Sequence, residues 1–89
     1  MTFQVLLHPR AARFLEKTDA TIRKRLRDHL KELREAPEKR GEQLKGSPFW
    51  RMRVGDHRVV YEIDRARNRV IVLFIGHRRD VYNDFSRLL

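Results

Sequence analysis

The chain contains no cysteine, which excludes disulfide bonds and metal sites built on thiolates. Long apolar runs are absent too, because the longest, Val70 to Ile75, is far too short to cross a bilayer. The first residues lack the pattern of a secretory signal, and no internal repeat or Ser/Gly linker divides the chain. We therefore expect one soluble domain, residues 1–89, located in the cytoplasm.

Acidic residues are scarce, with 12 Asp and Glu against 21 Lys and Arg, so the formal net charge is +9. So basic a domain usually meets a polyanion or an acidic partner, although a basic solvated surface is the simpler alternative. The distribution favours a site: all five lysines lie in residues 1–46, whereas residues 47–89 carry nine arginines and no lysine. The planar fork of arginine suits bidentate contacts with phosphate.

The apolar pattern of the first half predicts a strand followed by two helices. Residues 3–7 are expected to form the strand, and a short amphipathic helix is expected from Pro9, a residue suited to the first helical turn, to Lys17. A second helix, capped by Thr18 or Asp19, carries leucines at helical spacing on one face and mainly charged residues on the other. We expect the charged face to be solvated.

Pro37 is expected to end the second helix, and residues 38–48 to form a loop. A hairpin follows, and then a strand over 70–75 that is apolar on both faces and so belongs inside the sheet. Gly76 is expected to break this strand before a short terminal helix over 82–89. The prediction is an α+β fold of order β-α-α-β-β-β-α: a small, mainly antiparallel sheet with the helical hairpin packed on one face.

The hairpin has the most informative pattern in the chain, because apolar and polar residues alternate on both sides of Gly55-Asp56. Glycine at the first position of a two-residue loop suits a type II′ turn. That turn sets the register as Val54 opposite His57, Arg53 opposite Arg58, Met52 opposite Val59, and Arg51 opposite Val60. The core face then consists of Trp50, Met52, Val54, Val59, Tyr61 and Ile63.

The other face of this hairpin carries Arg51, Arg53 and Arg58. Like charges directly opposite each other on paired strands are destabilising, so a purely structural sheet would not need this arrangement. A docked anion would relieve the repulsion. Our interpretation is that the hairpin binds phosphate.

Arg78 and Tyr82 follow the buried strand, where a loop can bring them beside the arginines of the hairpin. Arginines there would stabilise the charge on a pentacoordinate phosphorus. A tyrosine surrounded by cations has its phenolate favoured, which lowers the phenol pKa toward that of a useful base. The alternative is that Tyr82 simply anchors the terminal helix in the core.

Three motifs occur in order: Leu-Lys-Gly at 44–46, Trp-Arg-Met-Arg-Val-Gly-Asp-His-Arg-Val-Val-Tyr-Glu at 50–62, and Gly-His-Arg-Arg-Asp-Val-Tyr at 76–82. Together they closely resemble the RelE/ParE superfamily of bacterial and archaeal toxin–antitoxin systems, over nearly the whole chain. The resemblance implies the sheet and helical hairpin described above. RelE-like members cleave messenger RNA in the ribosomal A site, whereas ParE-like members inhibit DNA gyrase.

The resemblance to RelE also implies roles for individual residues. Arg58 falls on the arginine that stabilises the transition state, Arg78 on the one that assists the leaving oxygen, and Tyr82 on the base toward the ribose 2′-OH. His77 stands where RelE has a basic residue, and a histidine there can share the proton transfer, which leaves that assignment open. The residues expected to bind RNA are Arg51, Arg53, Lys45 and Arg79.

The leading hypothesis is therefore a ribosome-dependent mRNA endoribonuclease that needs no metal or cofactor and leaves a 2′,3′-cyclic phosphate and a 5′-hydroxyl. The expected partners are an acidic RelB-like antitoxin encoded beside it, the A site of the 30S ribosomal subunit, and mRNA. Two alternatives stay open: a ParE-like gyrase inhibitor without nuclease chemistry, and a basic nucleic-acid-binding domain without enzymatic activity.

Overall fold

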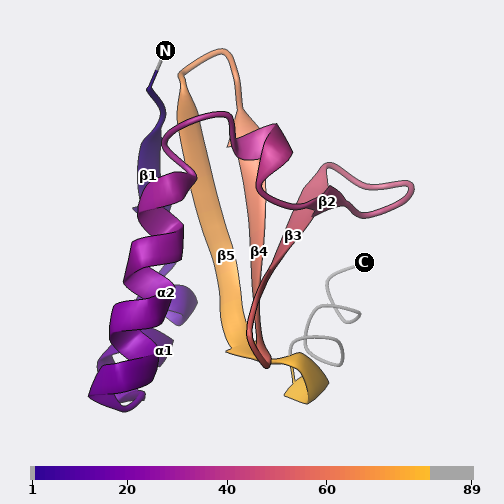
Figure 1. The fold of residues 1–89 in the computed structure, drawn as a ribbon. Coiled ribbons are helices and arrows are strands. Elements are labelled where there is room, and N and C mark those ends of the chain that lie inside the picture. Colours follow the sequence, from indigo (N-terminus) through magenta and orange to yellow (C-terminus); the bar gives the residue numbers. More distant parts are fainter. Residues whose placement is uncertain (1, 81–89) are drawn as a thin grey trace.

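The computed structural model describes residues 2–80 of the chain. Two helices and a 3₁₀ turn accompany five strands, in the order β1 (Gln4–Leu7), α1 (Pro9–Lys17), α2 (Ala20–Glu32), η1 (Pro37–Lys39), β2 (Glu42–Gln43), β3 (Phe49–Val54), β4 (His57–Asp64) and β5 (Arg69–His77) (Figure 1). The terminal helix expected over 82–89, with Tyr82, lies outside the described residues. In this part of the chain no helix has the length and apolar character that a membrane span requires.

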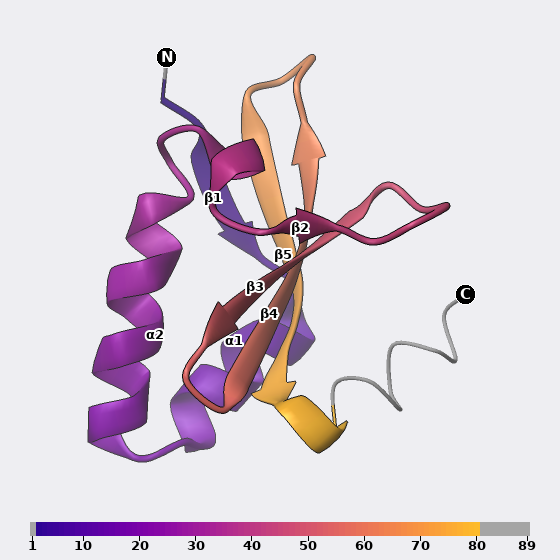
Figure 2. The same cartoon turned by 45° about the vertical axis from the view of Figure 1, so that its right-hand side comes forward.

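The five strands form one sheet in the order β1-β5-β4-β3-β2. β1 runs parallel to β5, and the other neighbours are antiparallel, which confirms the mainly antiparallel sheet. Two views show both helices on one side of this sheet (Figures 1 and 2). The other face of the hairpin, with its arginines, is therefore turned away from the helices.

Local hydrogen bonds explain where the helices begin. The His8 side chain accepts the Arg10 N–H at 3.2 Å, and Pro9 occupies the first turn of α1. Asp19 caps α2 by accepting the Ile22 N–H at 2.9 Å, so Asp19 rather than Thr18 is the cap. Arg23 contributes to the helical hairpin, because its side chain donates to the Leu15 carbonyl at 2.6 Å.

The expectation that Pro37 ends the second helix is wrong, since α2 already ends at Glu32. The backbone tightens there: the Leu33 N–H donates to the Leu30 carbonyl at 3.1 Å, three residues back rather than four. Pro37 instead starts η1, and the preceding Ala36 has a φ of 47°. Ala36 therefore lies in the left-handed region, which is uncommon for a non-glycine residue, and not in the extended region that most residues before proline adopt.

Two further boundaries differ from the expectation. The expected loop over 38–48 contains η1 and also β2, whose Glu42 and Gln43 pair with Arg51 and Trp50 of β3. Gly76 does not break the last strand, because β5 continues to His77. Both errors have one cause: pairing with a neighbouring strand decided the conformation, and a single strand's residues do not reveal that pairing.

The main core lies between the helices and the sheet. Its buried side chains are Ala11, Leu15, Leu26, Leu30, Leu33, Met52, Val54, Val59, Tyr61, Val70, Val72 and Ile75, with Trp50 and Ile63 packed against them. The expected core face of the hairpin is thereby confirmed. A smaller cluster, Val60 and Phe74, lies apart from this core, and the strand over 70–75 is therefore packed on both faces as expected.

A register irregularity between Val60 and Tyr61 in the β4–β5 pairing changes which residues of β5 face the core. Val70 and Val72 face it before the irregularity, whereas Ile75 faces it afterwards, an interval of three rather than two. His77 consequently pairs with His57, and Gly76 pairs with Arg58. The bulge therefore sets the face on which the end of β5 presents each side chain.

Candidate active site

The predicted hairpin register is confirmed in all four pairs, including Arg53 opposite Arg58. Gly55 has a φ of 59°, while Asp56 does not have a positive φ, as expected for a type II′ turn. Arg51 lies two residues from Arg53 and therefore on the same side of β3. We call Arg51, Arg53 and Arg58, together with Arg78, the arginine face.

The backbone brings Arg78 to the tip of the hairpin. Its N–H donates to the Asp56 carbonyl at 2.8 Å, so the first residue after β5 is tied directly to the β3–β4 turn. Arg78 is exposed, as is Arg53, whereas Arg51 and Arg58 are half-buried. The structure thus brings Arg78, which follows β5, close to the turn that joins Arg53 of β3 to Arg58 of β4.

The pKa of the Arg58 guanidinium lies below its ordinary value. Partial burial is the largest cause, followed by the positive charges of Arg53, Arg51 and Arg78, while Asp56 acts in the opposite direction. The three neighbouring cations therefore raise the free energy of the charged form of Arg58. The positive charges of the arginine face therefore repel one another, and a bound anion would add an attraction that offsets this repulsion.

The Arg58 side chain is oriented by its own turn. Its Nη1 donates to the Gly55 carbonyl at 2.8 Å and to the His57 carbonyl at 2.9 Å. These bonds use one of the three guanidinium nitrogens, and within residues 2–80 no carboxylate pairs with the group. Nε and Nη2 therefore remain for a phosphate, which arginine can bind with two parallel hydrogen bonds.

Arg51 is the one arginine of this face with an ion pair among the described residues. Its Nη2 lies 3.6 Å from Oε2 of Glu42. Because the Glu42 side chain is 74% exposed, solvent screens this ion pair and the pair is weak. The Nε of Arg51 is buried and has no hydrogen-bond partner in the described part of the chain. Arg51 thus keeps a donor that a ligand or an ordered water would satisfy.

His77 lies on the other face of the sheet. It pairs with His57, whose ring packs against Phe14 of α1, and the two histidine rings have their centroids 5.9 Å apart. Its Nδ1 accepts the Arg79 N–H at 3.4 Å, a long contact. The structure therefore does not bring the His77 ring together with Arg58, although His77 directly precedes Arg78 in the chain.

The other candidates are also placed apart or are not described. Lys45 is exposed in the loop between β2 and β3, at the end of β3 that is opposite the hairpin turn. The two ends of β3 are about 17 Å apart, because the strand rises by about 3.3 Å at each of five steps. Arg79 is exposed beside Arg78, and Tyr82 lies outside the described residues.

Sequence reasoning missed two residues near this face. Glu42 was assigned to a loop, and only the pairing of β2 with β3 places it beside Arg51. Arg25 of α2 was assigned to a solvated face, yet its Nη1 lies 3.4 Å from where a Cβ on Gly55 would stand. No sequence signal could have found Arg25, because helical periodicity predicts exposure but not which turn a side chain reaches.

Comparison with known proteins identifies the family. A model described as the ParE toxin of type II toxin–antitoxin systems, parDE, matches residues 5–82. The chain belongs to the ParE toxin family. No curated protein sequence matches it at comparable stringency.

Several solved structures similar to this family member contain RelE toxins. The chain is 25% identical to a chain of the RelBE2 toxin–antitoxin complex from Mycobacterium tuberculosis, with a TM-score of 0.81 over 88% of this chain and 100% of that one. A double arginine-to-alanine variant of E. coli toxin RelE in the free state is 26% identical, with a TM-score of 0.78 and full coverage of both chains. The archaeal RelE–RelB complex from Pyrococcus horikoshii gives 25% identity and a TM-score of 0.75 over 88% and 97%.

These findings confirm the resemblance inferred from the motifs. The chain is the toxin of a toxin–antitoxin system in the RelE/ParE superfamily, and its fold is that of RelE. Two of the similar structures are complexes of a RelE toxin with its antitoxin. An antitoxin partner for this ParE-family toxin follows from its membership in such a system.

Proposed function

We propose that this toxin is a ribosome-dependent mRNA endoribonuclease. The observation that carries the proposal is the arginine face, where Arg53 stands directly opposite Arg58 and Arg78 is tied to the same turn. A like-charge pair costs stability in the free protein and gains energy only when an anion is bound. This cost is understandable if the site evolved to meet a phosphodiester whose negative charge grows during reaction.

The proposed chemistry is an in-line transfer. The ribose 2′-oxygen forms a bond to phosphorus while the bond from phosphorus to the 5′-oxygen breaks, which gives a 2′,3′-cyclic phosphate and a 5′-hydroxyl. Tyr82 takes the proton of the 2′-hydroxyl, and Arg58 stabilises the charge on the pentacoordinate phosphorus. Arg78 assists by stabilising the charge on the leaving 5′-oxygen, which takes its proton from water. The position of His77 on the other face favours Arg78 over His77 for this role.

The ribosome would supply what this small domain lacks. The arginine face consists of exposed and half-buried arginines on one side of the sheet, and a substrate held only by these side chains is not fixed for in-line attack. We therefore propose that mRNA is presented in the A site of the 30S subunit. Arg51 and Arg53, with Arg79 and Lys45, would contact the RNA backbone without reading its sequence.

The test is primer extension on mRNA in a purified translation system, with and without ribosomes. Arg58→Ala, Arg78→Ala and Tyr82→Phe should each lower cleavage at least ~10²-fold, the usual contribution of a positioned catalytic group. Arg13→Ala, which removes an exposed arginine from α1, is the charge-matched control and should cleave normally. Undiminished cleavage by all three variants, or efficient metal-independent cleavage of naked RNA, would overturn the proposal.

A second candidate function rests on the family match itself, since the matching model is that of ParE toxins. ParE-like members inhibit DNA gyrase, and that activity would not need Arg58, Arg78 and Tyr82 as a chemical set. The discriminating measurement is gyrase supercoiling of relaxed plasmid in the presence of the toxin. Inhibition of supercoiling without mRNA cleavage would favour the gyrase function, and RNA binding without either activity would favour a non-enzymatic role.

The proposed partners follow from the same reasoning. An acidic RelB-like antitoxin would match the net charge of +9, and the ribosome and mRNA would be the cellular targets. The proposed site of action is accordingly the cytoplasm.

A further inference from the structure

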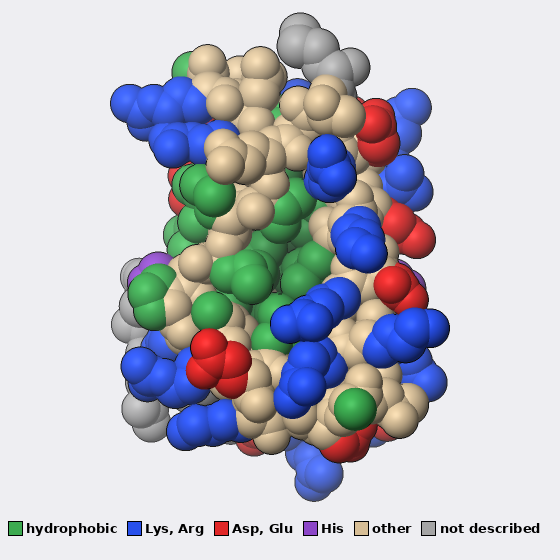
Figure 3. Space-filling model, turned by 90° about the vertical axis from the view of Figure 1, so that its left-hand side faces the viewer, with side chains coloured by type: hydrophobic (Ala, Val, Ile, Leu, Met, Phe, Trp, Pro, Cys, Tyr) green, Lys and Arg blue, Asp and Glu red, His purple; other side chains and the backbone are tan. Residues whose placement is uncertain are grey.

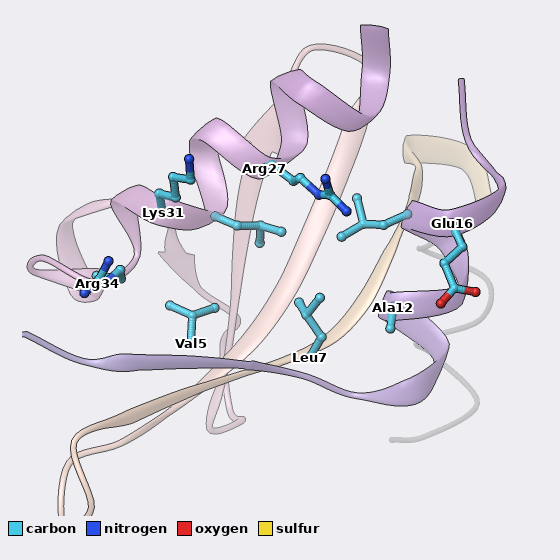
Figure 4. Close-up of a pocket in the computed structure, with 9 residues that line it drawn as sticks. Val5, Leu7, Ala12, Glu16, Arg27, Lys31 and Arg34 are labelled. Atoms are coloured by element: carbon cyan, nitrogen blue, oxygen red, sulfur yellow. The ribbon is translucent and has the colours of Figure 1, made fainter. Parts of the chain in front are cut away.

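Two features on the helix side of the sheet lie outside the arginine face: an apolar groove and a pair of histidines. The groove lies between β1 and α2, has a volume of about 340 Å³ and is bordered by Lys and Arg side chains (Figure 3). In close-up, Val5 and Leu7 project from β1 toward α2 (Figure 4). The groove is therefore at the β1 edge of the sheet, whereas the histidine pair joins β4 to β5 and directly precedes Arg78.

His57 and His77 form the last residue pair between β4 and β5. His57 is the first residue of β4 and His77 the last of β5, and their ring centroids are 5.9 Å apart with an interplanar angle of 74°. The His57 ring also contacts Phe14 of α1 edge to face, with 5.8 Å between the centroids. Edge-to-face contacts at these separations are favourable between neutral rings. A chain of ring contacts thus joins α1, β4 and β5.

The histidine pair is adjacent to Arg78 in sequence and in space. The Arg78 N–H donates to the carbonyl of Asp56, and Asp56 directly precedes His57. The ring pair and this hydrogen bond are therefore consecutive links between the end of β5 and the start of β4. Because residues of an extended chain alternate in direction, the backbone that turns the His77 ring toward α1 turns Arg78 toward the arginine face. A displacement of His77 would consequently move Arg78 as well.

The surroundings of His57 oppose a proton on its ring. Burial is the largest cause that lowers the pKa of His57, the charge of His77 is the next, and Arg25 of α2 acts in the same direction. Asp56 in the turn and Asp19 before α2 act in the opposite direction, without reversing the shift. The His57 ring is therefore neutral at neutral pH, and in acid a charged ring at His77 would repel a charged ring at His57.

We propose that the His57–His77 pair positions Arg78, so that acid weakens RNA cleavage by separating the two rings. Each ring takes up one proton from solvent, the two cations repel each other, and the Arg78 N–H loses the Asp56 carbonyl. Arg78 stabilises the leaving oxygen in the proposed reaction, so its displacement slows cleavage even though Arg58 stays in place. The effect on cleavage rests on the proposed nuclease function, whereas the movement of Arg78 does not.

Single-turnover cleavage of A-site mRNA on purified ribosomes, at about pH 7.5 and about pH 5.5, tests the effect on the site. His57→Phe keeps an aromatic ring against Phe14 but binds no proton. The wild-type rate should fall at least about fivefold more than the rate of this variant, since one pH unit below its pKa a histidine retains only about a tenth of its neutral form. The ribosome and Tyr82 contribute the same pH dependence to both proteins.

The control variant is His8→Asn. It removes an exposed imidazole that is not part of the pair, and asparagine can replace His8 as the cap of α1. Its change in rate with pH should stay within about twofold of the wild-type change, because the histidine pair is intact. Circular dichroism melts at both pH values verify that every variant is folded.

Hydrogen exchange measures the position of Arg78 without any cleavage. Protection of the Arg78 amide, corrected for the intrinsic exchange rate at each pH, should fall at least about tenfold in the wild type between about pH 7.5 and about pH 5.5. In His57→Phe this protection should be retained. The Val72 amide in the middle of β5 should stay protected in both proteins, which distinguishes local loosening from global unfolding.

The two measurements separate the positioning role from the proposed function. Equal pH dependence of cleavage in the wild type and His57→Phe, or an Arg78 amide that stays protected in acid, would overturn the positioning role. A wild-type toxin that cleaves no mRNA at either pH would overturn the nuclease function instead, and the Arg78 amide would still decide whether the histidine pair positions Arg78.

Discussion

Removal of the Arg53–Arg58 repulsion should stabilise the fold while it weakens the proposed site. The two-residue turn makes Val54 and His57 the hydrogen-bonded pair next to the loop, so Arg53 and Arg58 form the following, non-hydrogen-bonded pair. Side chains approach most closely at such positions. The charges of Arg53, Arg51 and Arg78 already lower the pKa of Arg58, after partial burial as the largest cause.

A double-mutant cycle isolates this pairwise energy. Arg53→Thr, Arg58→Thr and the combined variant keep a β-branched residue on each strand, and the cycle cancels the loss of the Arg58 bonds to the Gly55 and His57 carbonyls. Cross-strand charge pairs contribute roughly 0.2–1 kcal/mol, and the exposure of Arg53 places this pair in the lower half of that range. A gain of about 0.5 kcal/mol would raise the Tm by about 2–4 °C in a domain of this size.

Urea unfolding at low and high salt measures the coupling. We expect a repulsive coupling energy at about 10 mM ionic strength that shrinks toward zero at about 1 M, where the screening length falls to ~3 Å. At low ionic strength, Arg53→Thr should make the protein more stable and should also lower its cleavage of mRNA. A coupling energy that is attractive, or that does not change with salt, would refute the conclusion that Arg53 and Arg58 repel each other in the folded protein.

Three further predictions concern residues that support the hairpin. Gly41→Ala should destabilise the protein by about 1–3 kcal/mol in urea unfolding, because a Cβ there would lie 2.5 Å from the Arg51 carbonyl oxygen and 2.7 Å from the Tyr61 hydroxyl; an unchanged midpoint would contradict this close packing. Tyr61→Phe should cost about 1–3 kcal/mol, since the hydroxyl donates to the Pro37 carbonyl at 2.8 Å in a buried setting. Burial raises the pKa of Tyr61 to about 12, so the wild-type free energy of unfolding should fall as pH rises from about 10, where the unfolded phenol ionises, to about 12, and Tyr61→Phe should lack this loss. Burial also lowers the pKa of His57 from its ordinary 6.5, so the free energy of unfolding should fall as pH drops below that value, because the unfolded histidine gains a proton more readily. A contribution of His57 that raises the Tm on acidification to about pH 5 would be inconsistent with the fold.

The sequence alone determined the hairpin and its arginines. Alternation around Gly55 and a two-residue loop favour one register, which puts Trp50, Met52, Val54, Val59, Tyr61 and Ile63 on one face, and the structure has that register. Both features are local, since a turn and its flanking strands lie within about 14 residues. The same holds for the start of α2, where the Asp19 cap needs only the next three residues.

Other features depend on contacts between segments that are distant in the chain. β2, the extension of β5 through Gly76 and the parallel pairing of β1 with β5 exist because a neighbouring strand supplies hydrogen-bond partners. The irregularity opposite Val60 and Tyr61 shifts the alternation of β5, and with it the face on which His77 lies. Periodicity within one segment carries no information on such a shift.

The arginine face shows both contributions. Sequence placed Arg51, Arg53 and Arg58 on one side of a hairpin, because period-two geometry follows from the backbone. Only the tertiary structure decided that Arg78 is tied to the Asp56 carbonyl and that Arg25 reaches Gly55. Each of these depends on how separate elements pack, and packing is fixed by the burial of the whole core rather than by any one segment.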